Sequence, residues 1–364
     1  ISLHIGEPKG KAPEEALEVI FNNSDTFSKY PTSVGDFSLR EAYSRWLSER
    51  FSVDYINPDL NVLPLSGTRE GIFSFIQCAI DTSKENPKVL LPNPFYKIYE
   101  GAAIMAGAEP YYVNSEESKG FKPDFESIPE SVWKDCQLLI LCSPSNPTGY
   151  CLDKKEYKEL LSKAEKYNFL LCSDECYIDI YESNAHPPVG LLECDDLSEP
   201  NSKSVVFHSL SKRSNLAGLR SGFICAGKEV IKKLSLYRTY HGVTLSFPTQ
   251  KASTWAWSDK DHVLANRLEY DKKYKVAISC LDSIEDLERP QGGFYFWLKL
   301  PCDDEIFAKT LYQEESVLSL PGSYLATENN GFNPGKGYLR LAVVHDIETI
   351  TKAFNAVNKT LKKF

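Results

Sequence analysis

The sequence has no excess of basic residues, no long apolar run and no low-complexity segment. Its 364 residues include 41 Lys and Arg against 50 Asp and Glu, which gives a formal net charge of −9. Because nucleic-acid phosphates are bound by basic surfaces, this balance argues against a nucleic-acid partner. No stretch approaches the roughly 20 apolar residues that a membrane-spanning helix needs, so no membrane partner is expected either.

The ten cysteines are scattered singly, without a CxxC pair, so no metal site is expected. Several of them, such as Cys142, Cys172 and Cys225, lie in apolar runs, where a reduced cysteine packs as a small hydrophobic side chain. This usage is typical of a reducing compartment and predicts a cytoplasmic protein. No signal peptide is recognisable, although a start at Ile1 and a single Met, Met105, are consistent with residues missing at the N-terminus or inside the chain.

Short β-rich runs alternate with longer amphipathic stretches over the first two thirds of the chain. Several runs, such as 137–143 and 169–175, are continuous apolar blocks, which is typical of strands buried on both faces of a sheet. The stretch 152–168 has helical apolar spacing and charged faces. Together these patterns predict an α/β fold with a mainly parallel sheet. The expected strands are 61–67, 88–92, 109–113, 137–143, 169–175, 203–209 and 221–227.

The pattern changes after about residue 245, where a long, charged helical stretch over 250–280 begins. Three short apolar runs and a terminal helix follow, which predicts a second, smaller α+β domain, and the first 28 or so residues are expected to pack with it. The expected division is a large domain over 29–261 and a small domain made of 1–28 and 262–364. The later runs are 294–300, 317–322 and 337–343, and the terminal helix is 346–362.

The segment SLSKRSNLAGLRSGF, at 209–223, is the most informative one chemically. It follows an apolar strand and offers the hydroxyls of Ser209 and Ser211, the amine of Lys212 and, eight residues later, Arg220. Hydroxyls and an arginine around a lysine suit a phosphate monoester held beside an amine nucleophile. Taken alone, a lysine after a strand is more often a solvated surface residue, so this interpretation depends on the partners found elsewhere.

Two further strand ends carry groups that bind anions or oxygen atoms. SGTRE, at 66–70, ends a strand and opens a helix, where backbone N–H groups and the Thr68 hydroxyl form an anion site; an ordinary N-cap is the alternative. SPSNPTG, at 143–149, places Asn146 before a proline, which holds it extended so that its side chain can donate to a ligand oxygen. A simple turn is the alternative there, because Asn, Pro and Gly are turn residues.

Three other segments supply a carboxylate, aromatic rings and a guanidinium. Asp174 directly follows an apolar run and needs a partner, which a protonated pyridine nitrogen would provide; Tyr177 lies three residues further on. Tyr96 is placed to stack on a planar ring, and Arg340, inside a short apolar strand, suits a bidentate grip on a carboxylate. A helix cap, core packing and a structural ion pair are the respective alternatives. Open α/β sheets bind ligands at strand ends, and these groups lie at successive strand ends.

The sequence resembles the fold-type I pyridoxal-phosphate enzymes, specifically the class I/II aminotransferases. The matching motifs run through nearly the whole chain in family order, and NPTG with SLSK-x7-R is highly specific. The resemblance implies an α/β pyridoxal-phosphate-dependent transferase fold, with a mainly parallel seven-stranded sheet in the large domain. The motifs are GEP at 6–8, Y-x4-G at 30–35, SGTRE, PNPFYKIYEG at 92–101, NPTG, SDECY at 173–177, SLSK with Arg220, and YLRL at 338–341.

The resemblance also implies a role for each matching residue. Lys212, Asp174 and Tyr177 would be catalytic: Lys212 would form the Schiff base with pyridoxal 5'-phosphate, and Asp174 would pair with the pyridine nitrogen. Asn146 and Tyr177 would contact the ring's phenolic oxygen, and Tyr96 would stack on the ring. The remaining expected residues are Gly67, Thr68, Ser209, Ser211 and Arg220 on the phosphate, with Tyr30 reaching it from the neighbouring subunit of a homodimer, and Arg340, Gly6 and Asn146 on the substrate.

Within the family, the segments 92–103 and 209–223 look most like those of bacterial N-succinyldiaminopimelate aminotransferases of lysine biosynthesis. The expected activity is transfer of an amino group between an amino acid, with glutamate the first choice, and a keto acid. Aspartate, alanine and aromatic aminotransferases share the same cofactor motifs, and a pyridoxal-phosphate-dependent C–S β-lyase would use the same lysine and aspartate. A cofactor-binding regulator without turnover is disfavoured, and a nucleotide-binding protein lacks its GxGxxG or GxxxxGK[ST] sequence.

The residue that would meet the distal carboxylate of an acidic substrate is not evident from the motifs. Arg213, beside Lys212, is one candidate, and a surface position for Arg213 is the alternative.

Overall fold

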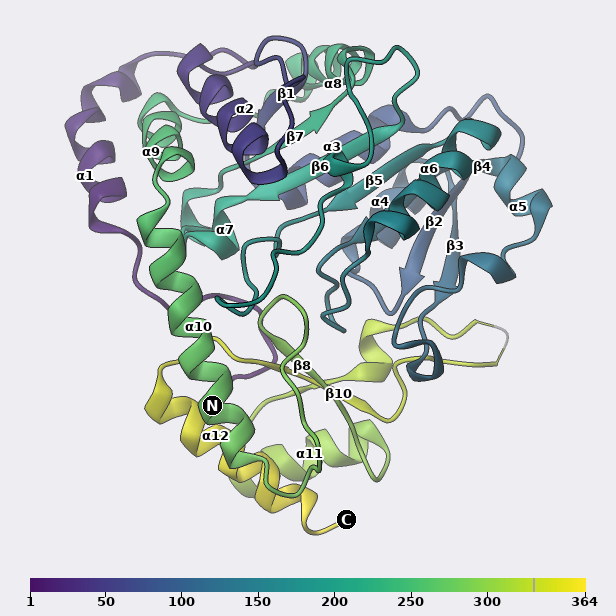
Figure 1. Cartoon of the computed structure of the whole chain (residues 1–364), viewed down its shortest axis with the longest axis vertical. Coiled ribbons are helices and arrows are strands. Elements are labelled where there is room, and N and C mark those ends of the chain that lie inside the picture. The colour runs from purple at the N-terminus through teal and green to yellow at the C-terminus, as the bar shows by residue number, and fades with distance from the viewer. Residues whose placement is uncertain (330) are drawn as a thin grey trace.

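The computed structural model describes residues 1–329 and 331–364, and its largest element is a seven-stranded sheet in the order β1-β7-β6-β5-β4-β2-β3 (Figure 1). β7 pairs antiparallel with both β1 and β6, and all other neighbours in this sheet are parallel. The expected mainly parallel α/β sheet is therefore confirmed. The strands are β1 (Val62–Leu65), β2 (Lys88–Asn93), β3 (Glu109–Asn114), β4 (Cys136–Cys142), β5 (Leu170–Asp174), β6 (Ser204–Ser209) and β7 (Gly222–Ala226).

The continuous apolar character of the central strands follows from the cores on both faces of this sheet. Along β4, Leu139 and Leu141 belong to one buried apolar cluster, while Leu138 and Ile140 belong to the other. Successive side chains of a strand point to opposite faces, so a strand covered on both sides is apolar at most of its positions rather than at every second one.

Helices cover the two faces of the large sheet (Figure 1). One face packs against α3 (Thr68–Ala79), α4 (Ile98–Met105) and α8 (Lys228–His241). The other packs against α2 (Phe37–Phe51), α5 (Glu130–Asp135), α6 (Lys154–Tyr167) and α9 (Phe247–Ser258).

A second, three-stranded antiparallel sheet lies below the large one in Figure 1, in the order β8-β10-β9. Residues of this sheet and of its helices share a third apolar cluster, which includes Leu3, Tyr274, Phe296 and Phe354. The elements are β8 (Tyr295–Lys299), β9 (Leu320–Pro321), β10 (Tyr338–Ala342), α10 (Asp261–Cys280), α11 (Asp304–Glu315) and α12 (Ile347–Leu361).

The helical stretch expected over 250–280 is two helices, α9 and α10, rather than one. The break falls at 259–260, where the Asp259 carboxylate accepts a hydrogen bond from the backbone N–H of His262 at 3.0 Å. An aspartate in this position satisfies an N–H group that the first turn of a helix leaves unpaired, so it starts a new helix instead of continuing the old one.

The N-terminal segment contacts both parts of the molecule. The backbone of Leu3 hydrogen-bonds to Ala342 of β10 and to Leu318, which precedes β9, whereas α1 (Glu14–Asn22) packs on α9 at the left of Figure 1. The two domain boundaries expected from the sequence stay a prediction. In the described part of the chain, no helix has both the length and the apolar character to cross a membrane.

Candidate active site

A pocket of about 650 Å³ opens at the carboxyl ends of β4, β5 and β6, beside the small sheet. It brings together residues that the sequence analysis selected from segments far apart in the chain. Eleven of the expected residues line it: Gly6, Thr68, Tyr96, Asn146, Asp174, Tyr177, Ser209, Ser211, Lys212, Arg220 and Arg340. Gly67 lies against Arg220 without lining the pocket, and Tyr30 lies outside it with a fully exposed side chain.

Lys212 projects into the pocket from α7 (Leu210–Arg213), a short helix that starts directly after β6. The hydroxyl of Ser209 accepts a hydrogen bond from the backbone N–H of Ser211 at 3.1 Å, which caps this helix. The Lys212 amine donates to the carbonyl oxygen of Gly6. Burial lowers the pKa of Lys212 to about 8, so at pH 7 roughly a tenth of the amine is neutral and nucleophilic, far more than in an ordinary lysine.

Asp174, at the end of β5, is a buried carboxyl group that faces the same pocket. Its oxygens accept hydrogen bonds from the Tyr99 hydroxyl at 2.7 Å and from the backbone N–H of Cys176 at 3.2 Å. Burial raises the pKa of Asp174, and these hydrogen bonds oppose the rise. Both donors are neutral, so the site fits a ligand that brings its own positive charge, such as a protonated ring nitrogen.

One side of the pocket has the composition of a phosphate site. Thr68 begins α3, whose N-terminal N–H groups attract anions, and the hydroxyls of Ser209 and Ser211 and the guanidinium of Arg220 line the same pocket. A Cβ atom at Gly67 would lie 2.3 Å from Nη2 of Arg220, and Gly67 has φ +83°. Glycine is therefore required for Arg220 to lie at this helix N-terminus.

Arg340, on β10 of the small sheet, closes another side of the pocket. Its Nη1 donates to Oδ1 of Asn146 at 2.8 Å and its Nη2 to the carbonyl oxygen of His4 at 2.7 Å. The guanidinium lies 4.3 Å from the ring centroid of Tyr295, and the buried Nε has no hydrogen-bond partner among the described residues. A buried guanidinium with an unsatisfied donor suits a carboxylate ligand.

Tyr177 and Tyr96 contribute aromatic rings and hydroxyls. The hydroxyls of Tyr177 and Tyr295 are 3.1 Å apart, and burial raises the pKa of Tyr177, so its hydroxyl keeps its proton and is able to donate. The Tyr96 hydroxyl accepts a hydrogen bond from Nε of Arg69 at 2.7 Å.

The placement of Arg213 contradicts both sequence-based expectations for it. Arg213 neither lines the pocket nor lies on the surface: its side chain is buried, and Nε donates to Oδ2 of Asp179 at 2.8 Å. Residues one turn along a helix from a given side chain share its face, whereas the immediate neighbour does not. Arg213 follows Lys212 directly and is therefore turned away from the pocket.

Several pocket residues were missed by the sequence analysis, among them His4, Arg69, Tyr99 and Tyr295. Arg69 directly follows Thr68, and Tyr99 lies three residues after Tyr96 in the same motif, so helical spacing could have suggested Tyr99. His4 and Tyr295 contribute through packing between distant segments, for which the sequence holds no signal. In residues 1–329 and 331–364, no three His, Cys, Asp or Glu side chains are grouped to hold a metal ion.

Comparison with known proteins agrees with this geometry. The family model described as "Aminotransferase class I and II" matches residues 1–357. The chain belongs to this family. It is accordingly a pyridoxal-phosphate-dependent aminotransferase, whose substrates are small amino and keto acids. The pocket fits this cofactor, because it offers an amine, a buried carboxyl group and a phosphate-binding helix terminus together.

The relatives differ in the substrates named for them. The LL-diaminopimelate aminotransferase of Aquifex aeolicus is 32% identical over 372 residues, covering 100% of this chain and 91% of its own. The solved structure of an aminotransferase from Neisseria meningitidis is 41% identical, with a TM-score of 0.94 and coverage of 99% and 91% of the two chains. That of a probable N-succinyldiaminopimelate aminotransferase from Thermus thermophilus is 26% identical, with a TM-score of 0.86 and coverage of 99% and 95%.

Proposed function

We propose that this aminotransferase takes its amino group from glutamate and passes it to a keto acid of the diaminopimelate type, with or without a succinyl group, in lysine biosynthesis. Relatives named for diaminopimelate and N-succinyldiaminopimelate support this assignment. The observation that carries it is a further guanidinium in the pocket, that of Arg69, besides Arg340 and the phosphate-side Arg220. A substrate with two carboxylates would engage both. The ten free cysteines favour a cytoplasmic location.

Arg69 is the better of two candidates for the distal carboxylate. Its Nε donates to Tyr96, and its terminal nitrogens make no hydrogen bond to the described residues. Lys97 also lines the pocket, but its ammonium already contacts Thr327, Glu100 and the ring of Phe95. The terminal nitrogens of Arg69 therefore have N–H donors left for a ligand, whereas the ammonium of Lys97 is largely engaged by protein groups.

The proposed roles of the site residues follow from their chemistry. Pyridoxal phosphate, when bound, supplies an electron sink that acidifies the substrate Cα–H bond. Lys212 accepts the proton from the substrate Cα and delivers it to the C4′ position, for which its lowered pKa suits it. Asp174 keeps the ring nitrogen protonated, Arg340 orients the substrate by its α-carboxylate, and Asn146 and Tyr177 donate to the ring's phenolic oxygen.

In this proposal, different residues bind the phosphate group and the face of the cofactor ring. Tyr96 stacks on the ring. Gly6 lines the substrate side, where its carbonyl oxygen accepts a hydrogen bond from the Lys212 amine. Tyr30 of a second subunit would complete the phosphate site of a homodimer, because its own side chain is fully exposed and outside the pocket of its own chain. The phosphate holders are Gly67, Thr68, Ser209, Ser211 and Arg220.

The first experiment is the visible absorbance of the purified, cofactor-loaded protein before and after addition of glutamate. We expect the band of the lysine-bound cofactor to disappear with glutamate and to return with a keto acid of the diaminopimelate series. The Lys212→Ala variant should hold the cofactor but show no turnover; turnover like that of the wild type would refute the role of Lys212. A band that glutamate leaves unchanged, with release of a thiol from a sulfur amino acid, would favour the C–S β-lyase instead.

Arg69→Met tests the distal carboxylate site. Loss of a charge-assisted hydrogen bond costs about 1.5–3 kcal/mol, so kcat/KM for dicarboxylic substrates should fall about 10- to 100-fold. The kcat/KM for alanine, which has no distal carboxylate, should stay within about twofold. Lys97→Met is the matched control, with a smaller effect expected. An equal loss for glutamate and alanine would contradict a role in distal recognition.

A further inference from the structure

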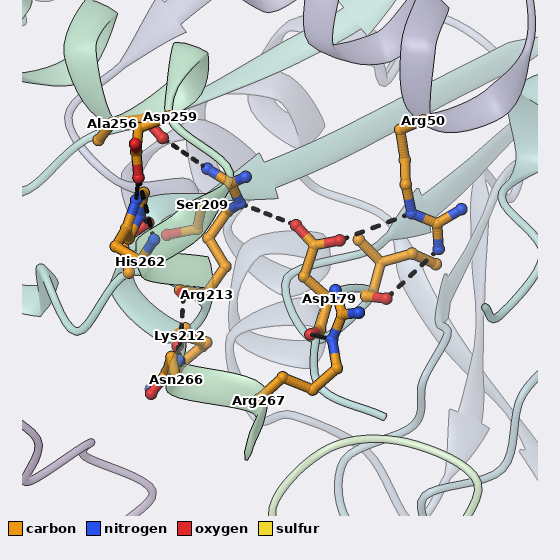
Figure 2. Close-up of polar contacts among 12 residues, drawn as sticks. Arg50, Asp179, Ser209, Lys212, Arg213, Ala256, Asp259, His262, Asn266 and Arg267 are labelled. Atoms are coloured by element: carbon orange, nitrogen blue, oxygen red, sulfur yellow. Dashed lines mark hydrogen bonds and ion pairs between the residues drawn. The ribbon is translucent and has the colours of Figure 1, made fainter. Parts of the chain in front are cut away.

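Lys212 and Arg213 are neighbours in a helix of only four residues, yet their side chains lie on different sides of it. Lys212 lines the pocket, whereas Arg213 is only 4% exposed and is absent from the pocket lining. Figure 2 shows the Arg213 guanidinium between Asp179 and the backbone near Ala256, directed away from Lys212. A helix this short makes few hydrogen bonds of its own, so its orientation depends on contacts outside it.

Hydrogen bonds and aromatic contacts fix the Arg213 side chain. Its Nε donates to Oδ2 of Asp179 at 2.8 Å, its Nη1 donates to the carbonyl oxygen of Ala256 at 2.9 Å, and its guanidinium lies 4.5 Å from the ring centroid of Trp257. The planar guanidinium holds its donors in a fixed fork, so it is able to satisfy two partners in different directions at once. A lysine in its place would reach one of them.

Asp179 connects Arg213 to the segment that carries Asp174. Asp179 lies five residues after Asp174. Its carboxylate Oδ1 is 3.5 Å from Nε of Arg50, and its backbone carbonyl oxygen accepts a hydrogen bond from Nε of Arg267 at 3.2 Å (Figure 2). Burial acts to raise the pKa of Asp179, but the charges of Arg213 and Arg50 outweigh it and hold the pKa below its usual value. The ionised pair therefore ties the end of β6, with its lysine, to the end of β5, with its aspartate.

A second set of hydrogen bonds holds the same short helix from α10. The side-chain amide of Asn266 donates to the carbonyl oxygens of Lys212, at 3.1 Å, and Arg213, at 3.0 Å. The Ser214 hydroxyl is 2.8 Å from Nε2 of His262. These contacts hold the backbone at and after Lys212 against α10. The position of the lysine is therefore fixed by contacts outside the pocket as well as by those inside it.

We propose that Arg213 is a positioning residue whose pair with Asp179 fixes the direction in which Lys212 presents its amine. The inference rests on the proposed role of Lys212 in aminotransfer. Arg213 does not act through its charge, because the pKa of Lys212 is lowered first by burial and, among the positive charges, by Arg340 and Arg69. A changed behaviour of Lys212 after replacement of Arg213 therefore reports a changed position.

Four variants separate positioning from stability. Arg213→Met keeps most of the side-chain volume and removes both hydrogen bonds, and Arg213→Lys keeps the charge. The double variant Asp179→Asn with Arg213→Met removes both buried charges and so avoids leaving one of them unpaired. Arg289→Met is the control, because Arg289 also pairs with an aspartate, the more exposed Asp271, and forms no hydrogen bond or ion pair with α7 among the described residues.

The first measurement uses the protein without cofactor: the rate of acylation of Lys212 by acetic anhydride across pH, read by mass spectrometry of its peptide. We expect a midpoint near pH 8 for the wild type and for Arg289→Met. In Arg213→Met the amine should gain solvent, and the midpoint should move toward the ordinary lysine value of about 10.4. Arg213→Lys should lie between the two.

The second measurement is the glutamate half-reaction of the loaded enzyme. In Arg213→Met, and also in the double variant, kcat should fall about 10- to 100-fold with KM nearly unchanged, since a displacement of about 1 Å has effects of this size. The isotope effect with Cα-deuterated glutamate should rise in both. The double variant should regain stability to urea relative to Arg213→Met without regaining kcat.

Two outcomes would overturn the inference. One is an unchanged acylation midpoint with normal kcat in Arg213→Met; the other is a kcat that recovers in the double variant together with stability. If Arg213→Met does not fold, Arg213→Lys and the double variant decide the question by the same readouts. If wild-type protein fails to react with glutamate, the proposed donor is wrong, and the acylation midpoints still decide the role of Arg213.

Discussion

At the scale of single residues, burial decides what the charged groups of this site are able to do. Asp174 is a carboxyl group that burial makes harder to ionise, and the groups that donate hydrogen bonds to it, from Tyr99 and Cys176, are neutral. Such a group gains most from a cation bound close to it. Burial favours the neutral form of Lys212 as well, and for an amine this is the form that accepts a proton. The environment of Asp174 thus suits a partner for a cationic ring nitrogen, and the environment of Lys212 suits a proton acceptor.

The Asp174→Asn variant removes the charge while keeping the size of the side chain. We expect kcat to fall by about 100-fold or more, as when a preorganised charged or polar group at a reacting centre is removed, while the cofactor still binds. Stopped-flow absorbance of the glutamate half-reaction measures this. Tyr99→Phe, which removes only a hydrogen bond to Asp174, is the control and should have a much smaller effect. A rate within a few-fold of the wild type in Asp174→Asn would argue against Asp174 as the partner of the ring nitrogen.

Residues at strand ends and in the motifs that follow them were predictable from the sequence, whereas their neighbours in the adjoining helices were not. Asp174 ends an apolar strand and Arg340 lies within one, and the sheet fixes the direction of such side chains once the strands are placed. Arg69 and Arg213 each lie in a helix, one residue from a motif residue. Their directions depend on the phase of the helix and on what packs against it, which is why Arg69 was missed and Arg213 was placed wrongly.

At the scale of elements, α6 illustrates a boundary that local sequence determines. Asp153 accepts a hydrogen bond from the Glu156 backbone N–H at 2.8 Å, and the Glu156 carboxylate accepts one from the Asp153 backbone N–H at 2.8 Å. This reciprocal capping box satisfies two N–H groups that the start of a helix leaves unpaired. The expected stretch 152–168 and the observed Lys154–Tyr167 agree for this reason.

Asp153→Ala should lower the free energy of unfolding by about 1 kcal/mol, because one capping hydrogen bond is lost. Urea denaturation followed by circular dichroism measures the change, and kcat should stay unchanged because α6 contributes no residue to the pocket. Asp153→Ser keeps a capping oxygen and should retain most of the stability. Equal destabilisation by Ala and Ser would show that the cap is not what Asp153 contributes.

The break between α9 and α10 shows the limit of helical periodicity as a guide to elements. The charged stretch 250–280 has a helical pattern throughout, and a single Asp259 divides it. Whether an aspartate inside such a pattern caps a new helix or lies on an exposed face depends on tertiary contacts: here His262, three residues on, also bonds to Ser214 near the pocket. The break thus allows His262 to contact Ser214, directly after α7. This contact is evident only in the folded structure.

At the scale of the whole molecule, apolar side chains gather on the exposed N-terminal segment. Phe21, Phe27 and Tyr30 are 78%, 61% and 100% exposed, in and after α1. Exposed apolar groups close together are typical of an interface with another protein chain. We propose that this segment contributes to the dimer and carries Tyr30 to the partner's phosphate site.

Hybrid dimers test whether the active sites are shared. Tyr30→Phe should weaken cofactor binding by about tenfold through the loss of a hydrogen bond to a charged phosphate, whereas Tyr240→Phe, at another exposed tyrosine, should not. In a hybrid of Tyr30→Phe with Lys212→Ala, one site combines an intact Lys212 from the first subunit with an intact Tyr30 from the second. Each hybrid should then bind the cofactor at that site with wild-type affinity and be active there, although neither parent dimer is both active and tight. Hybrids that remain as weak as Tyr30→Phe itself, or a wild-type chain that sediments as a monomer, would show that Tyr30 does not serve the neighbouring site.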